Sequence, residues 1–157
     1  MPGEFTSGVG LPGLVTWGTD REERALRGKV IESPKLPAPM HGGAFSAGVE
    51  APAGSTVYVS GQVSMDAEGN VVGEGDVRAQ TEKVLENVAT VLEEAGGSLD
   101  DVVKVTVFIT DMGHYDGIHE VRRRFFQEPY PASSMVEVSA LIDPRLLVEV
   151  EAVAVIP

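Results

Sequence analysis

Two glutamates near the C-terminus carry the clearest chemical signal in the chain. Glu149 and Glu151 lie in the run Leu-Val-Glu-Val-Glu-Ala-Val (residues 147–153), whose other positions are apolar and predict a strand. Side chains of a strand alternate between two faces, so the two acids share a face with Leu147 and Val153. Two interpretations stay open. Both acids are hydrated on an open sheet face, or one of them holds and activates a water molecule.

A predicted helix at about residues 114–128 carries a second group of polar side chains. Tyr115 and His119 come first, and the run Arg122-Arg123-Arg124 follows. His119 can supply a proton or a hydrogen bond, although a lone helical histidine is more often structural. Glu120 and Arg124 are spaced for an ion pair within the helix. The arginines can also meet acids of another subunit.

Composition excludes several classes of function. The chain has 157 residues, a formal net charge of −12 and no cysteine. So acidic a surface repels phosphate backbones, so we expect no nucleic-acid partner. Without cysteine there are no disulfides, thiol nucleophiles or thiolate metal sites. The three histidines are scattered, and the usual nucleotide-binding, zinc and nucleophile motifs are missing, so we expect neither metal nor cofactor.

Membrane and export signals are also missing from the sequence. No apolar run approaches the roughly 20 residues that a membrane helix needs. The first residues lack the basic start and apolar stretch of a secretory signal. We therefore expect a soluble, cytoplasmic protein.

Local patterns predict the elements that must position these residues. Strands are expected at 57–63, 71–72, 102–110, 134–140 and 147–156, with helices at 76–95 and about 114–128. Asp76 should cap the first helix, and Gly96-Gly97 should end it. Its expected apolar face consists of Val77, Val84, Leu85, Val88, Val91, Leu92 and Ala95. This order predicts an α+β fold, a mixed sheet with two helices packed on one face.

Residues 29–157 read as a single domain and residues 1–28 as an N-terminal extension. The extension is rich in glycine and proline and contains Trp17. It is either a loosely held tail or an arm that covers a cleft or a neighbouring subunit. The prolines at 34, 37 and 39 predict an extended connector at residues 33–43.

Seven colinear segments together resemble one family. They are K-V-I-E-S-P followed by A-P (29–39), A-F-S-A-G-V (44–49), V-Y-V-S-G-Q (57–62), Q-T…L-E-N-V (80–88), V-V-K-V-T-V-F-I-T-D-M (102–112), P-A-S-S-M-V-E-V (131–138) and V-E-V-E-A-V-A (148–154). From about Lys29 to Val155 the chain resembles the reactive-intermediate deaminase family, also called Rid, YjgF or endoribonuclease L-PSP-like.

The resemblance implies a chorismate-mutase-like fold, assembled as a homotrimer with a cleft at each of three subunit interfaces. Archetypal members hydrolyse imines and enamines made by pyridoxal-phosphate enzymes, releasing ammonia and a keto acid without a cofactor. The family's water-holding glutamate falls on Glu149. Phe45 stands where the family has a tyrosine. The residues expected to bind the small-molecule substrate are Phe45, Ser60, Gly61, Tyr115, Ser133, Ser134 and Met135.

Position 133 departs from the family's pattern. Archetypal deaminases have Pro-Ala-Arg-Ser/Thr here, and that arginine clamps the substrate carboxylate bidentately. This chain has Ser133. Losing such a contact costs roughly a hundredfold in affinity, so we expect a substrate other than the simple 2-imino acids. Arg122 and Arg145 are candidates to replace the clamp, and His119 stands where the archetype often has asparagine.

Three functional hypotheses follow from these residues. The first is hydrolysis of an imine, enamine or related activated bond, with Glu149 and His119 catalytic and Ser133 and Ser134 donating to a substrate oxygen. Tautomerisation or cyclisation would use the same parts. The second is a non-catalytic ligand-binding or interaction trimer. The third, ribonuclease activity, is opposed by the net charge of −12 and the lack of a basic stripe.

Overall fold

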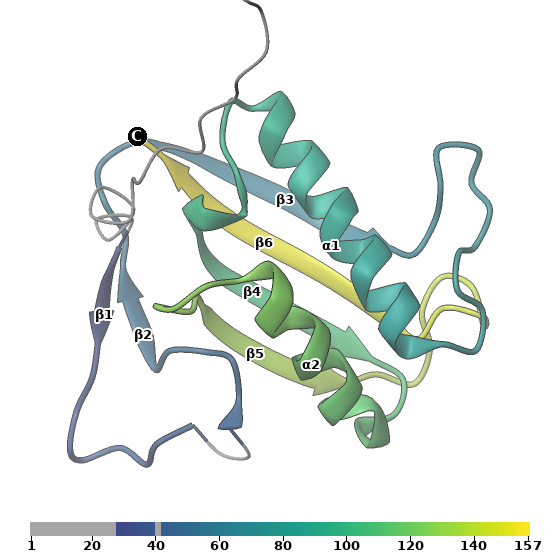
Figure 1. Cartoon of the computed structure of the whole chain (residues 1–157), viewed down its shortest axis with the longest axis horizontal. Helices are drawn as coiled ribbons and strands as arrows, with labels where there is room; N and C mark the ends of the chain where they lie inside the picture. The colour runs from purple at the N-terminus through teal and green to yellow at the C-terminus, as the bar shows by residue number, and fades with distance from the viewer. Residues whose placement is uncertain (1–27, 40–41) are drawn as a thin grey trace, which may run out of the picture.

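A four-stranded mixed sheet covered by two helices forms the body of the protein. The computed structural model describes residues 28–39 and 42–157. The strands are β3 (Ser55–Val63), β4 (Val102–Ile109), β5 (Ala132–Glu137) and β6 (Val148–Ile156), in the order β3-β6-β4-β5. Strand β6 runs antiparallel to β3 and β4, whereas β4 and β5 are parallel. Helices α1 (Val77–Glu94) and α2 (Tyr115–Phe125) lie side by side on one face (Figure 1). The predicted α+β fold is confirmed.

A second, two-stranded sheet stands beside the first (Figure 1). Strand β1 (Lys29–Ile31) pairs antiparallel with β2 (Gly48–Glu50), so the two ends of the proline-rich connector lie together. Strands of three residues are too short to show a periodic pattern, which is why the sequence did not reveal them. Residues 1–27 of the N-terminal extension, which include Trp17, lie outside the described residues.

The strand predicted at residues 71–72 is wrong. Val71 makes one isolated antiparallel bridge to Met65, and the Val72 N–H donates to the Ser64 carbonyl at 2.9 Å. The turn predicted at residues 66–70 is present, because Asp66 accepts hydrogen bonds from the Asn70 backbone and side chain. The chain then turns directly into α1, which leaves no length for a paired strand.

Helix α1 begins and ends where its capping residues predict. Asp76 Oδ1 accepts from the backbone N–H of Arg78 at 2.9 Å and of Ala79 at 3.1 Å. At the other end Gly96 has φ +83°, and the N–H groups of Gly96 and Gly97 bond back to the carbonyls of Glu93 and Leu92. This is a Schellman C-cap, which requires the left-handed conformation that glycine adopts without strain.

We expect the Gly96→Ala variant to lower the free energy of unfolding by about 1 kcal/mol, because alanine is strained at positive φ. A Cβ at Gly96 would have no heavy atom within 4 Å, so the loss reports backbone conformation alone. Urea unfolding followed by circular dichroism measures it. Gly96→Asn is the matched control and should lose less, since asparagine tolerates this conformation. Equal stability of Gly96→Ala and wild type would contradict this account.

The hydrophobic core lies between the helices and the sheet. Helix α1 contributes five of its predicted apolar residues, Val77, Val84, Leu85, Val88 and Leu92, all buried. Val91 and Ala95 were predicted to join them and do not. Val91 is 36% exposed at the edge of the apolar stripe, and Ala95 is the exposed C-cap. The sheet contributes Val105, Val107, Val148, Val150 and Ala154 to this core.

A buried glutamine connects α1 to the start of β6. Gln80 is fully buried, and its side-chain amide donates to the carbonyls of Arg145 and Gly73 at 2.8 and 3.2 Å. Its Oε1 accepts from the Leu147 N–H at 2.8 Å. Because all its polar atoms are bonded, this burial carries no desolvation penalty from unpaired groups. It fixes where β6 begins, and so where Glu149 lies.

Helix α2 ends at Phe125, three residues before the predicted end at 128. The ion pair predicted within this helix, Glu120 with Arg124, is wrong. Glu120 pairs instead with Arg78 of α1 at 2.8 Å, and Arg124 pairs with Glu82 of α1 at 3.6 Å. Partners on the neighbouring helix replace the intrahelical ones because the two helices pack against each other.

Candidate functional site

The predicted site residues divide between the two faces of the sheet. On β6, Val148, Val150, Ala152 and Ala154 are buried beneath the helices, whereas Glu149, Glu151 and Val153 are not. We call the other side the open face. By alternation and strand register it carries Tyr58, Lys104, Thr106, Phe108, Ser134, Glu149, Glu151 and Val153. Glu149 and Glu151 therefore share a face, as the alternation predicts.

The carboxylate of Glu149 lies over Gly61. Strand β3 contains a bulge, since Val59 pairs with Ala152 while Gln62 pairs with Val150, leaving one extra residue on β3. A Cβ on Gly61 would stand 1.9 Å from Glu149 Oε1, so the carboxylate occupies space that any other residue would fill. Glu149 is half-buried, whereas Glu151 is exposed. Only the first of the two acids is therefore held against the backbone of a neighbouring strand.

A second group of predicted residues gathers around Ala44, beside α2. The Ala44 N–H donates to His119 Nδ1 at 3.2 Å, and its carbonyl accepts from Arg122 Nη2 at 3.3 Å. The ring of Tyr115 packs on the imidazole of His119 with centroids 4.2 Å apart. A Cβ on the neighbouring Gly43 would lie 2.3 Å from the Phe45 ring and 3.0 Å from the Tyr115 hydroxyl. Helix α2 and the segment 43–46 thus form one polar cluster.

His119 is a neutral imidazole in this cluster. Burial, reinforced by the charges of Arg122 and Arg123, lowers its pKa to about 4. Because Nδ1 accepts the Ala44 N–H, the ring proton is on Nε2. Near neutral pH His119 therefore offers a hydrogen bond through Nε2 rather than the proton of an imidazolium. Of its two expected roles, hydrogen bonding fits this geometry.

This lowered pKa makes stability depend on pH. Above about pH 6.5 His119 is neutral in both folded and unfolded chains; between there and pH 4 only the unfolded chain takes up the proton. Wild type should therefore lose about 3 kcal/mol more unfolding free energy from pH 7 to pH 4 than His119→Gln does. Urea titrations of both at each pH measure the difference, with His114→Gln as the matched control. Equal pH dependence in wild type and His119→Gln would show that this imidazole is not held neutral.

Arg122 and Ser133 form a direct contact in the same cluster. Ser133 pairs with the core residue Val105, so it points toward α2, where its Oγ accepts from Arg122 Nη2 at 3.1 Å. The Arg122 side chain is 1% exposed, and its buried Nε has no hydrogen-bond partner. Burial lowers the Arg122 pKa to about 10, which leaves the guanidinium charged at neutral pH. A cation thus lies directly behind Ser133.

Ser134 and Met135 lie away from this contact. Ser134, next to Ser133 on β5, is on the open face, where its Oγ accepts from Lys104 Nζ at 2.9 Å. The two serines therefore do not converge on one group within the protomer, as donation to a single substrate oxygen requires. Met135 packs against the core.

Arg145 also lies apart from the cluster. It is exposed and held by Asp143 through an ion pair of 2.8 Å. Arg122 is thus the one of the two suggested clamp replacements that lies beside position 133.

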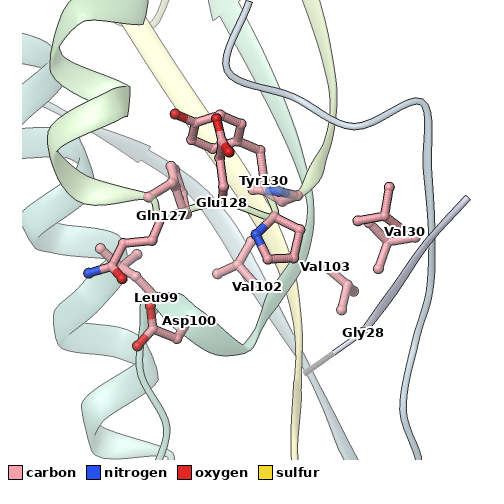
Figure 2. A pocket seen from close by; sticks show the side chains of 13 residues that line it. Gly28, Val30, Leu99, Asp100, Val102, Val103, Gln127, Glu128 and Tyr130 are labelled. Atoms are coloured by element: carbon pink, nitrogen blue, oxygen red, sulfur yellow. The ribbon is translucent and has the colours of Figure 1, made fainter. Parts of the chain in front are cut away.

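Two cavities lie near the connector. The smaller one, of about 70 Å³, lies between Leu99 and Asp100 and the segment after α2, and none of the predicted site residues lines it. Figure 2 shows the side chains around it. A larger, open hollow of about 950 Å³ is bounded by residues 32–39, 43–47 and 128–130. Phe45 and Gly43 line this hollow, so it adjoins the polar cluster around Ala44. Within residues 28–39 and 42–157, no three His, Asp or Glu side chains gather as a metal site would require.

Comparison with known proteins identifies the family. The family model described as Endoribonuclease L-PSP matches residues 36–156. The chain belongs to this family. Its members include proteins named Rid and YjgF, so the resemblance seen in the sequence is confirmed.

Relatives of the Rid family match most of the chain. A RutC family protein of Pyrococcus abyssi (strain GE5 / Orsay) is 41% identical over 127 residues, which cover 80% of this chain and 95% of the relative. A 2-iminobutanoate/2-iminopropanoate deaminase of Dermatophagoides farinae is 36% identical over 128 residues, covering 82% and 96%. The crystal structure of YyfB from Yersinia pestis, a Rid family protein of unknown function, matches with a TM-score of 0.76 and 32% identity, covering 83% and 100%.

Sequence reasoning missed two features of the candidate site. The first is Lys104, which interrupts an apolar strand and by alternation shares a face with Thr106. That signal was available. The pairing of β4 with β6 shows that this is the face of Glu149. The link of Ala44 to both His119 and Arg122 joins positions 75 and 78 residues apart, and a single sequence carries no signal for such a contact.

Proposed function

We propose that this protein is a cofactor-free enzyme that hydrolyses an imine, an enamine or a related activated C–N bond. Glu149 accepts a proton from a water molecule as its oxygen bonds to the imine carbon. The nitrogen takes up that proton from Glu149 and a second one from the new hydroxyl, so the C–N bond breaks and ammonia and a carbonyl product leave. The observation that carries this proposal is the carboxylate held over the β3 bulge at Gly61. A relative named as an imine deaminase supports it.

We further propose a homotrimer whose clefts lie between subunits. Glu149 is on the open face, whereas His119, Arg122 and Ser133 lie toward the helices, so one protomer does not bring them together. An interface that places the open face of one subunit against the Ala44 cluster of the next would complete a site. Sedimentation equilibrium should give three times the mass of the chain. A monomer at micromolar concentration would contradict the shared cleft.

The substrate is proposed to differ from the simple 2-imino acids. The reason is that Ser133 stands where the family resemblance implies an arginine that clamps the substrate carboxylate. The test is a panel of freshly generated imines, enamines and lactam-like compounds, with ammonia and product masses measured. At least one member should react faster than its uncatalysed background and lose that reaction in Glu149→Ala. No reaction above background, or an unchanged rate in Glu149→Ala, would contradict the proposal.

The non-catalytic binding trimer is the second candidate. The replacement of the family's tyrosine by Phe45 favours it, since a hydroxyl is lost there. The Tyr115 hydroxyl argues against this candidate, because it lies by Gly43 and the Phe45 ring and so supplies a hydroxyl at the same place.

Product formation without ammonia release would indicate tautomerisation or cyclisation. RNA cleavage that survives repurification would favour the nuclease.

A cytoplasmic location is part of the proposal. In the described part of the chain no helix is long and apolar enough to cross a membrane.

A further inference from the structure

Arg122 is a buried cation without an acidic partner in the part of the chain that the structure describes. Within residues 28–39 and 42–157 no carboxylate lies within ion-pair distance of it, and its two acceptors are the Ala44 carbonyl and the Ser133 hydroxyl. Its Nε is buried and makes no hydrogen bond. Arg123 and Arg124 on the same helix are exposed, so Arg122 alone carries its charge into the interior. A buried charge without a counter-ion favours an anion nearby.

The bond to Arg122 also determines what Ser133 can do. The hydroxyl oxygen already accepts from Nη2 at 3.1 Å, so its own proton is available to donate. Among the described residues no acceptor takes that proton. Ser133 is half-buried, whereas Arg122 is 1% exposed, so the serine is the more accessible of the two groups and the charge lies behind it. A hydroxyl polarised by a guanidinium binds an anionic oxygen more strongly than a neutral one.

We infer that Arg122 is a positioning residue that makes Ser133 the acid-recognition group of the substrate pocket. This inference rests on the proposed function and names its substrate class, an imine or enamine whose carboxylate lies beyond the carbon that bears the nitrogen. A serine side chain is shorter than an arginine, and here the charge lies on its far side. A carboxylate attached directly to the imine carbon falls short of it, whereas one carried on a short chain reaches it.

Binding of stable carbonyl compounds tests the inference without requiring turnover. Isothermal titration with the full-length protein compares levulinate, whose acid lies two carbons from the carbonyl, with the neutral levulinamide and with 2-oxobutanoate. Wild type should bind levulinate roughly tenfold more tightly than either. No measurable binding of levulinate, or equal binding of levulinate and levulinamide, would overturn the inference. Tighter binding of 2-oxobutanoate would overturn the substrate class.

Variants then assign the effect to the pair. Ser133→Ala and Arg122→Gln should each abolish the preference for levulinate over levulinamide, and Arg122→Lys should restore part of it. Arg124→Gln, an exposed arginine on the same helix, and Ser139→Ala are the matched controls and should keep the preference. A merely structural role of Arg122 would weaken both ligands equally. If Arg122→Gln does not fold, Ser133→Ala still decides, because it keeps the cation and removes only the hydroxyl.

The outcome is separable from that of the proposed function. Glu149→Ala should keep the levulinate preference, because the acid-recognition group lies on the other side of the sheet from Glu149. Charge-selective binding without ammonia release from any imine would sustain the inference and contradict hydrolysis. Ammonia release without a preference for levulinate over levulinamide would support hydrolysis and contradict the inference.

Discussion

A Gly61→Ala variant should fold normally and lose ammonia release by about 10²- to 10⁴-fold, as much as removal of a general base. The added Cβ would stand 1.9 Å from Glu149 Oε1 and 2.8 Å from its Cδ. Both atoms belong to the end of a flexible side chain, so the carboxylate turns away and the strands stay paired. The free energy of unfolding should therefore change by about 1 kcal/mol or less. Rate measurements and urea unfolding on the same preparation separate these two effects.

A double-variant cycle is the control for this prediction. In a Glu149→Ala background the Cβ no longer meets a carboxylate, so Gly61→Ala should cause no further loss of rate. Independent losses in the two variants would mean that Gly61 contributes to the reaction otherwise than by leaving room for Glu149. A full rate in Gly61→Ala would remove the geometric basis for Glu149 as the water-holding group.

Introducing an arginine at position 133 should not by itself create a carboxylate-binding site. In Ser133→Arg the new guanidinium would lie beside that of Arg122, which now contacts Ser133 Oγ at 3.1 Å. Two buried like charges without a carboxylate should lower the free energy of unfolding by about 3 kcal/mol. The double variant Ser133→Arg/Arg122→Gln removes this repulsion. It should bind 2-oxobutanoate roughly a hundredfold more tightly than wild type, through a direct arginine–carboxylate contact.

Calorimetry with 2-oxobutanoate and levulinate, together with thermal unfolding, measures both parts of this prediction. The double variant should reverse the preference of wild type and favour 2-oxobutanoate. Arg122→Gln alone is the matched control and should gain no affinity for it. A stable Ser133→Arg single variant with high affinity for 2-oxobutanoate would show that Arg122 and position 133 do not compete for one place.

The sequence predicted elements whose signal is local. The N-cap at Asp76, the end of α1 at the left-handed Gly96 and the alternation of β6 each depend on a few neighbouring residues, and all were correct. Two of the errors came from packing between distant segments. Val91 was wrongly placed in the core because the width of the buried face of a helix depends on the elements packed against it. Glu120 pairs with Arg78 because a second helix lies alongside.

The candidate site was predictable in part for the same reason. Strand alternation singled out Glu149, and family resemblance singled out position 133. That Arg122 lies behind Ser133 depends on how α2 packs over β5, which no single-residue pattern encodes. The opposite directions of Ser133 and Ser134 follow from period two, yet only the burial of Val105 shows which serine points inward.

The division of the polar groups between the two sides of the sheet has a consequence for how this protein would behave in a cell. In the proposed homotrimer each site would take Glu149 from one chain and the Ala44 cluster from another, so a lone chain would not hold both against the same substrate. Turnover per chain would then rise with expression level and vanish on dilution. A chain that lacks Glu149 and a chain with a defective Ala44 cluster would form some intact sites when mixed. Two chains with the same defect would form none.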